Sequence, residues 1–70
     1  MEFKNKEEIE IIVEKIIEII GETTFYDELD ENYGVTDENM LSKRKMEDFI
    51  DYLNETYFLD EELGDFFDQF

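Results

Sequence analysis

The reactive side chains of this 70-residue sequence are almost all carboxylates. There are 22 Asp and Glu against six Lys and Arg, with no His and no Cys. Acid-base catalysis by paired carboxylates needs a cleft that raises the pKa of one of them by burial, and a chain of this size has little room for one. Ser42, the only serine, has no imidazole to activate it as a nucleophile. The composition therefore predicts a protein that is not an enzyme and has no cofactor.

Calcium is the metal to consider for so acidic a chain, and the best window for it runs from Asp30 through Asn32 to Gly34. An EF-hand loop needs oxygen ligands at positions 1, 3 and 5, Gly at position 6 and Glu at position 12. Counted from Asp30, position 6 is Val35 and position 12 is Leu41. The pattern does not match, so the sequence predicts no specific metal site.

The formal net charge of −16 indicates the class of partner. Solubility of a small domain requires a net charge of only about 2 to 8 in magnitude, and repulsion among the excess carboxylates destabilises the compact state. Nucleic acid and anionic membranes are repelled, whereas basic surfaces are attracted. We therefore expect the partner to be the basic surface of a nucleic-acid-binding protein or nuclease, with no direct contact to nucleic acid and no membrane.

The acids recur at four-residue spacing, which on a helix places them in rows with steps of about 6 Å. Rows of negative charge on a rigid support resemble the phosphates that a basic groove binds with release of counterions. The alternative is that these acids are simply solvated side chains on the exposed faces of the helices and have no binding role. The predicted partner-binding residues are two such rows and one apolar residue among the acids: Glu10, Glu14, Glu18 and Glu22; Glu47, Asp51 and Glu55; and Ile11.

Four apolar or aromatic residues lie outside the main apolar stripes and are candidate anchors for a partner: Ile11, Tyr26, Tyr52 and Phe58. Anchors of this kind often dominate the binding energy inside a charged rim. The alternative for each is partial burial against a neighbouring helix, which widens the core. Ile11 is the best candidate for a contact because acids surround it, and it could equally mark the face of a homodimer.

The first element that must hold these residues is a helix predicted from Lys6 to Ile20. Its apolar residues recur with the 3.6-residue period of an amphipathic helix, and Gly21 follows as the glycine expected just past a helix end. The predicted core face is formed by Ile9, Ile12, Val13, Ile16, Ile17, Ile19 and Ile20.

A short second helix is predicted from Phe25 to Tyr33. Thr24 provides a hydroxyl cap, with Asp27 three residues on, in a variant of the capping box. Phe25, Leu29 and Tyr33 repeat at helical spacing, and Gly34 follows as a stop.

The third helix is predicted to be capped by Ser42. Its apolar stripe is formed by Met46, Phe49, Ile50, Leu53 and Tyr57. Met40 and Leu41 are out of phase with this stripe, which indicates a separate turn or a distorted first turn. The basic cluster that opens the helix is unfavourable for the helix dipole and suggests a partner contact or an ion pair with the first helix: Lys43, Arg44 and Lys45.

The last helix is predicted to be capped by Asp60 and to present Leu63, Phe66, Phe67 and Phe70 at helical spacing. Gly64 inside it costs roughly 1 kcal/mol relative to alanine. This helix must therefore be stabilised by docking.

Together these patterns predict one all-α domain over residues 1–70, a small bundle of three main helices plus one short helix. The 41% apolar and 16% aromatic content, arranged in stripes, argues against the disorder that high charge often signals. No signal peptide and no apolar run of about 18 residues is evident. We therefore expect a soluble, cytoplasmic protein.

The stretch TFYDEL at residues 24–29 resembles the SFxEDL-type segment that precedes the serine of acyl carrier proteins. This resemblance implies a phosphopantetheine group on a serine and acidic contacts to basic partner enzymes. The sequence departs from the family where Asp-Ser-Leu is expected, since it reads Asn32-Tyr33-Gly34 there. Ser42 lies further on, beside a basic run, and is interpreted as a helix cap.

In size and charge the chain also resembles the small acidic proteins with which phages and mobile elements block restriction, CRISPR and other host nucleases. That resemblance implies an inhibitor that mimics nucleic acid. An immunity protein or antitoxin that neutralises a basic toxin is an alternative with the same electrostatic steering.

Overall fold

The all-α prediction is confirmed. The computed structural model describes residues 4–68, without the side chains of Phe66 and Phe67, and this part of the chain contains α-helices, a short 3-10 helix and no strand. The elements are α1 (Lys6–Ile20), α2 (Glu22–Tyr33), η1 (the 3-10 helix Glu38–Met40), α3 (Lys43–Tyr57) and α4 (Asp60–Phe67).

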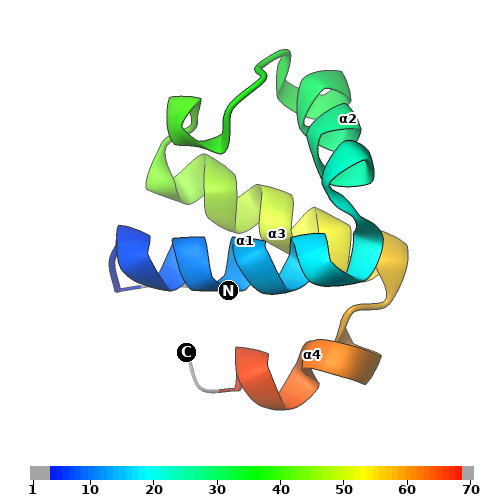
Figure 1. Cartoon of the computed structure of the whole chain (residues 1–70). Coiled ribbons are helices and arrows are strands. Elements are labelled where there is room, and N and C mark those ends of the chain that lie inside the picture. The colour runs from blue at the N-terminus through cyan, green and yellow to red at the C-terminus, as the bar shows by residue number, and fades with distance from the viewer. Residues whose placement is uncertain (1–3, 69–70) are drawn as a thin grey trace.

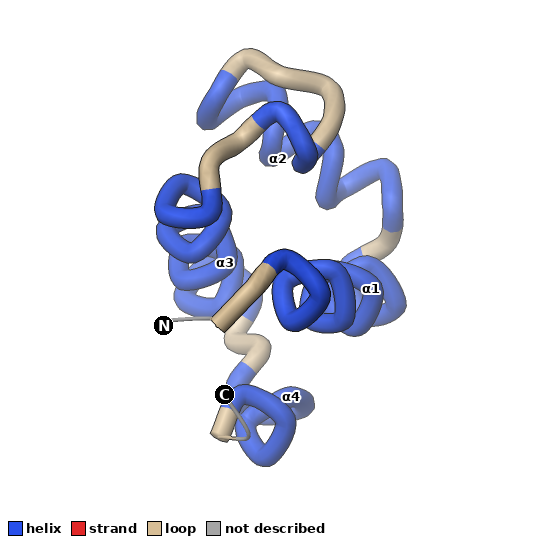
Figure 2. The backbone as a smooth tube through the Cα atoms, turned by 90° about the vertical axis from the view of Figure 1, so that its left-hand side faces the viewer, coloured by secondary structure: helices blue, strands red, loops and turns tan. Residues whose placement is uncertain are grey.

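The helices α1 and α3 form the centre of the molecule. They lie side by side and run in the same direction, as the two views in Figure 1 and Figure 2 show together. The helix α2 and η1 lie above this pair, and α4 lies below it and runs back toward the start of α1 (Figure 1). The fold is thus a central pair of helices with α2 and η1 on one side and α4 on the other.

The helix α1 has the predicted bounds. The side chain of Asn5 caps its start by accepting a hydrogen bond from the backbone N–H of Glu8 at 3.1 Å. Its end is closed by Gly21, whose N–H donates to the carbonyl of Ile17 at 2.9 Å.

The predicted start of the second helix was wrong by three residues, because α2 begins at Glu22 and not at Phe25. Gly21 occupies the N-cap position at φ 92°, and its carbonyl accepts the N–H of Phe25 at 3.1 Å. A glycine that both ends α1 and begins α2 leaves no linker between them. Thr24 therefore lies inside the helix and does not cap it.

The predicted cap of the third helix is confirmed, since the Ser42 hydroxyl accepts the N–H of Lys45 at 3.3 Å. Met40 and Leu41 belong to a separate turn. Met40 ends η1, and Leu41 follows in extended backbone. Met40 and Leu41 do not continue the apolar stripe of α3, because the chain changes direction between η1 and α3.

The last helix begins at Asp60, so Asp60 lies in its first turn and does not cap it. The Asp60 carboxylate instead accepts a hydrogen bond from the side-chain amide of Asn54 at 3.2 Å, which ties α4 to α3. Leu59 and Leu63 are buried in the core, so α4 is docked. Phe70 lies outside the described residues.

All four α-helices contribute side chains to one apolar cluster, and Leu41 and Leu59 join it from the connections between elements. An aromatic group joins α2 to α3: the ring centroid of Phe49 lies 5.4 Å from that of Phe25 and 5.6 Å from that of Tyr33, distances at which aromatic pairs attract. The buried core residues are Ile9, Ile12, Val13, Ile16, Phe25, Leu29, Leu41, Met46, Phe49, Ile50, Leu53, Leu59 and Leu63.

Candidate protein-binding surface

The acidic row on α1 contains three residues and not four. Glu10, Glu14 and Glu18 are exposed along the helix, whereas Glu22 is the first residue of α2, past the turn at Gly21. A single four-residue row was therefore a wrong expectation, because the helix ends before the fourth position. Glu18 forms an ion pair with Lys15 at 3.7 Å, and neither Glu10 nor Glu14 has an ion-pair partner among residues 4–68.

The acidic row on α3 is less uniform. Glu47 forms an ion pair with Lys43 at 3.1 Å, and its side chain is only 13% exposed. Asp51 is half-buried, and Glu55 is exposed. The basic residue Lys43 thus pairs within its own helix, and the charge of this row is partly neutralised where it begins.

The two rows lie on neighbouring helices and differ in exposure. The helices α1 and α3 lie side by side (Figure 2), and their buried residues belong to a common core. The α1 row is exposed along its length, whereas Glu47 and Asp51 of the α3 row are partly buried. The α1 row therefore presents more of its charge to a partner than the α3 row does.

The four residues outside the apolar stripes differ in exposure. Ile11 is 45% exposed and Phe58 is 71% exposed. Tyr52 is 39% exposed and stacks on Phe49 with centroids 6.4 Å apart, while Tyr26 is half-buried and packs against the core. Ile11 and Phe58 therefore remain apolar side chains available to a partner. Met40, which the sequence analysis assigned to a turn and not to the candidate anchors, is 65% exposed and joins them.

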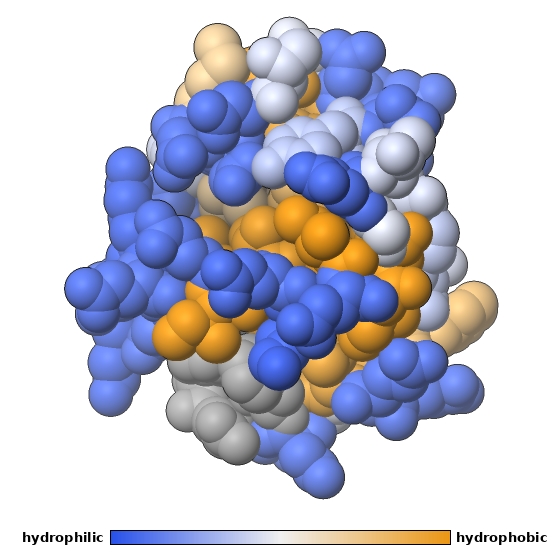
Figure 3. Space-filling view, viewed as in Figure 1, coloured by the Kyte–Doolittle hydropathy of each residue, from blue (hydrophilic) through white to orange (hydrophobic). Residues whose placement is uncertain are grey.

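An open groove of about 340 Å³ lies between α1, α2, η1 and the start of α3. Figure 3 shows apolar surface in this region, above α1 and between hydrophilic side chains. The floor of the groove is apolar and is formed by Ile9, Val13, Ile17, Leu41 and Met46.

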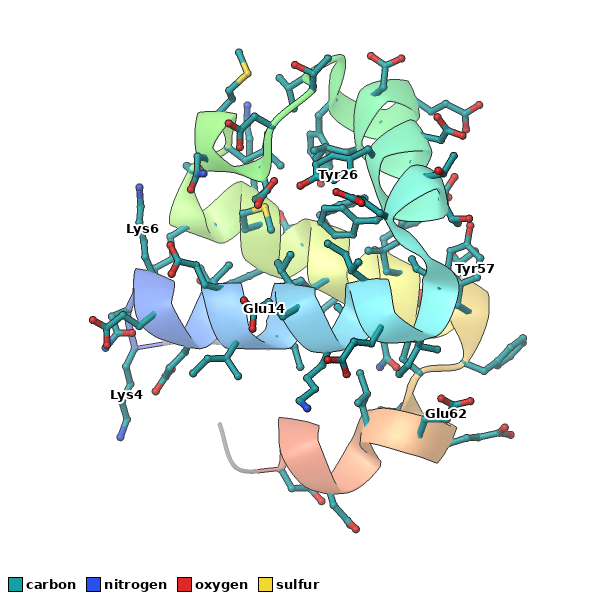
Figure 4. The ribbon with its side chains drawn as sticks, viewed as in Figure 1. Lys4, Lys6, Glu14, Tyr26, Tyr57 and Glu62 are labelled. Carbon is teal, nitrogen blue, oxygen red and sulfur yellow. The ribbon has the colours of Figure 1, made fainter. Side chains whose placement is uncertain are left out.

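The edges of the groove are polar. Glu10 and Glu14 of α1 form one edge, and Figure 4 shows Glu14 on the face of α1 toward the viewer. Tyr26 and Glu38 form the opposite edge, where the Tyr26 hydroxyl donates to the Glu38 carboxylate at 3.1 Å. This bond links α2 to η1 across the loop that joins them, between residues that are 12 positions apart.

Burial raises the pKa of Tyr26, and the hydrogen bond to Glu38 and the nearby acids raise it further. An ordinary tyrosine is already protonated at neutral pH, and the raised pKa extends the range in which Tyr26 donates to Glu38 further into alkaline conditions. Burial also raises the pKa values of Tyr33 and Tyr57, with nearby acids as the second cause. Tyr33 donates to the carbonyl of Lys45 at 3.4 Å, so these phenols serve as fixed donors between helices.

The end of the groove nearest the starts of α1 and α3 is basic. Lys6 and Lys43, the first residues of these helices, line it, and Figure 4 shows Lys6 at that end of α1. Lys43 is paired with Glu47, whereas Lys6 has no ion-pair partner among residues 4–68. The groove is thus lined by apolar side chains and by charges of both signs.

Two further observations concern cations and membranes. Among the described residues, no three acids come together in a way that could hold a metal ion. No helix between residues 4 and 68 has both the length and the apolar character needed to cross a membrane.

Sequence reasoning identified part of this surface. Glu10 and Glu14 were predicted partner-binding residues and Tyr26 was a candidate anchor, but their meeting around one groove was not foreseen. The one sequence signal for the groove was the break in phase at Met40 and Leu41, which marks the η1 turn that forms its far wall.

Comparison of the chain with protein-family models, with curated proteins and with solved structures gives no significant match. The function must therefore be argued from charge and geometry.

Proposed function

We propose that this protein is a binding inhibitor that mimics nucleic acid and occupies the basic groove of a nucleic-acid-binding enzyme, such as a restriction or CRISPR nuclease. Phages and mobile elements use small acidic proteins for this purpose, and the proposal places the chain in that functional class.

The observation that carries the proposal is the density of charge along the molecule. The Cα atoms extend 30 Å along the longest axis, and the net charge is −16. Duplex DNA has one negative charge per about 1.7 Å of axis, so a duplex of that length carries about 18 charges. The protein therefore nearly matches the charge that a DNA-binding groove meets over the same length.

The distribution of the charge also supports mimicry. A duplex has phosphates on two strands, and the protein likewise has acidic residues in rows on two neighbouring helices, α1 and α3. The carboxylates of Glu10, Glu14 and Glu55 are exposed on helices that are held by one core. Such a support limits the ordering that binding requires, which favours affinity.

The test is affinity capture from a bacterial lysate with the immobilised protein, followed by elution with rising salt or with duplex DNA. We expect a nuclease or another nucleic-acid-binding protein to be retained and to be released by both. The Glu14→Lys/Glu18→Lys variant should lose at least tenfold in affinity for the captured protein, because reversal places repulsive charges on the α1 row.

The matched control is Glu61→Lys/Glu62→Lys, which changes the net charge equally on the exposed start of α4 and should bind more tightly than the α1 variant. Capture of a basic protein that DNA does not displace would contradict mimicry and favour an immunity protein. A phosphopantetheine mass on Ser42 would instead establish a carrier.

A further inference from the structure

The groove above α1 is large for a molecule of this size. Its volume of about 340 Å³ lies within the range of known ligand sites, about 300 to 1,000 Å³. A small domain gains its stability by covering apolar surface, and the floor residues Ile9, Val13, Leu41 and Met46 are buried in the core. Ile17 is only partly buried, and a band of apolar surface remains visible above α1 (Figure 3). The space is large enough for one or two side chains of another molecule.

The charges around the groove favour a cationic occupant. Glu10 and Glu14 lie on its edge without ion-pair partners among the described residues. At its basic end, Glu47 offsets the charge of Lys43. Outside the groove, the net charge of −16 attracts cations and repels anions from every side.

We infer that the groove receives one aliphatic or aromatic side chain from an Arg- or Lys-flanked segment of the target protein. Its floor buries the apolar side chain, while Glu10 and Glu14 pair with the flanking cations. This inference rests on the proposed function and adds to it a central apolar anchor, the arrangement in which a few buried contacts carry most of the binding energy.

Two other occupants fit the charge less well. A second copy of the chain would bring another 16 negative charges against the same surface. An anionic amphiphile would gain from Lys6 but would meet the carboxylates of Glu10, Glu14 and Glu38 along the groove.

The test uses fluorescein-labelled peptides of the form Arg-Arg-Gly-X-Gly-Arg-Arg, with X as Leu, Phe or Ala, titrated with the full-length protein in fluorescence anisotropy. All three peptides carry the same charge, so they differ only in the side chain offered to the groove. We expect the Leu and Phe peptides to bind about tenfold more tightly than the Ala peptide, given the apolar surface they bury.

Two variants test whether the preference for the Leu peptide over the Ala peptide arises in the groove. Ile17→Phe fills the groove from its floor, and Asn39→Trp covers it from an exposed edge position without disturbing the core. Each should reduce the preference for Leu over Ala to less than twofold. Glu10→Gln/Glu14→Gln should weaken all three peptides and preserve that preference, and the matched control Glu55→Gln/Glu61→Gln should weaken them less.

Equal affinities for the three peptides, or a preference that survives both groove variants, would overturn the inference and leave the nucleic-acid mimicry standing. Self-association in analytical ultracentrifugation that Asn39→Trp abolishes would assign the groove to a second copy and would also overturn it. Failure of the proposed function is distinguishable, because it is read from the lysate capture and its displacement by DNA.

Discussion

At Phe58 the backbone adopts the left-handed conformation, with φ 56° and ψ 45°, directly after the end of α3. This position favours glycine, because a Cβ atom there costs roughly 1 to 2 kcal/mol. The ring is 71% exposed, so burial within the chain does not offset that cost. A left-handed residue is a common helix terminator, and the Phe58 N–H donates to the carbonyl of Asn54, so the conformation itself serves to end α3. The exposure of the ring is what leaves Phe58 among the candidate anchors.

We expect Phe58→Gly to raise the free energy of unfolding by about 0.5 kcal/mol, since relief of the left-handed strain exceeds the entropy that glycine gains when unfolded. Urea denaturation followed by circular dichroism measures this change. Phe58→Ala keeps the strained conformation and serves as the control, with stability close to that of the wild type. A loss of stability in Phe58→Gly would mean that the ring packs on the fold after all.

At the scale of elements, two glycines have opposite roles. Gly21 has φ 92° and ψ 150° and joins α1 to α2 without a linker, in a region of backbone conformation that only glycine adopts readily. Gly64 lies inside α4, where glycine is less favourable than alanine. A Cβ atom would meet nothing within 4 Å at either position, so backbone conformation alone decides the effect of substitution.

Gly64→Ala should therefore stabilise the protein by about 1 kcal/mol, and Gly21→Ala should destabilise it by about 1 to 3 kcal/mol. Thermal unfolding of the two variants beside the wild type measures both. Gly34→Ala, at the left-handed end of α2 with φ 67°, is the control for strain at a helix end and should destabilise the protein as well. Equal effects of Gly21→Ala and Gly64→Ala would contradict the assigned backbone roles.

At the scale of the whole molecule, the core works against electrostatic self-repulsion. The longest axis of 30 Å is close to the Debye length of about 30 Å at 0.01 M salt, whereas the Debye length at physiological ionic strength is about 8 Å. In dilute buffer every carboxylate thus repels every other, and in salt only near neighbours do. Such repulsion can be tolerated because the apolar stripes of all the helices meet in one cluster.

Raising NaCl from about 0.01 M to about 0.3 M should therefore increase the melting temperature by about 5 °C or more, since about 1 kcal/mol shifts it by 4 to 8 °C in a domain of this size. Differential scanning calorimetry measures the shift. Glu61→Gln/Glu62→Gln, with two fewer charges, should show a smaller salt dependence. A melting temperature that does not respond to salt would show that the acids contribute little strain to the fold.

The sequence by itself determined the helical class, the bounds of α1, the Ser42 cap and most of the core. These features depend on contacts within a few residues, which periodicity and capping patterns record directly. The start of α2 was missed because Gly21 belongs to two helices at once, a property of backbone geometry that no local pattern shows.

Only the tertiary structure decided how these elements meet. Periodicity assigns each helix a buried face but does not say which helix covers it. The partial burial of Glu47 and Asp51 and the docking of α4 through Leu59 and Leu63 are therefore results of packing. The groove depends on the same step, because Glu14 of α1 and Glu38 of η1 line it together only once these two elements are packed in one fold. A site built between elements distant in the sequence leaves no local signature in any one of them.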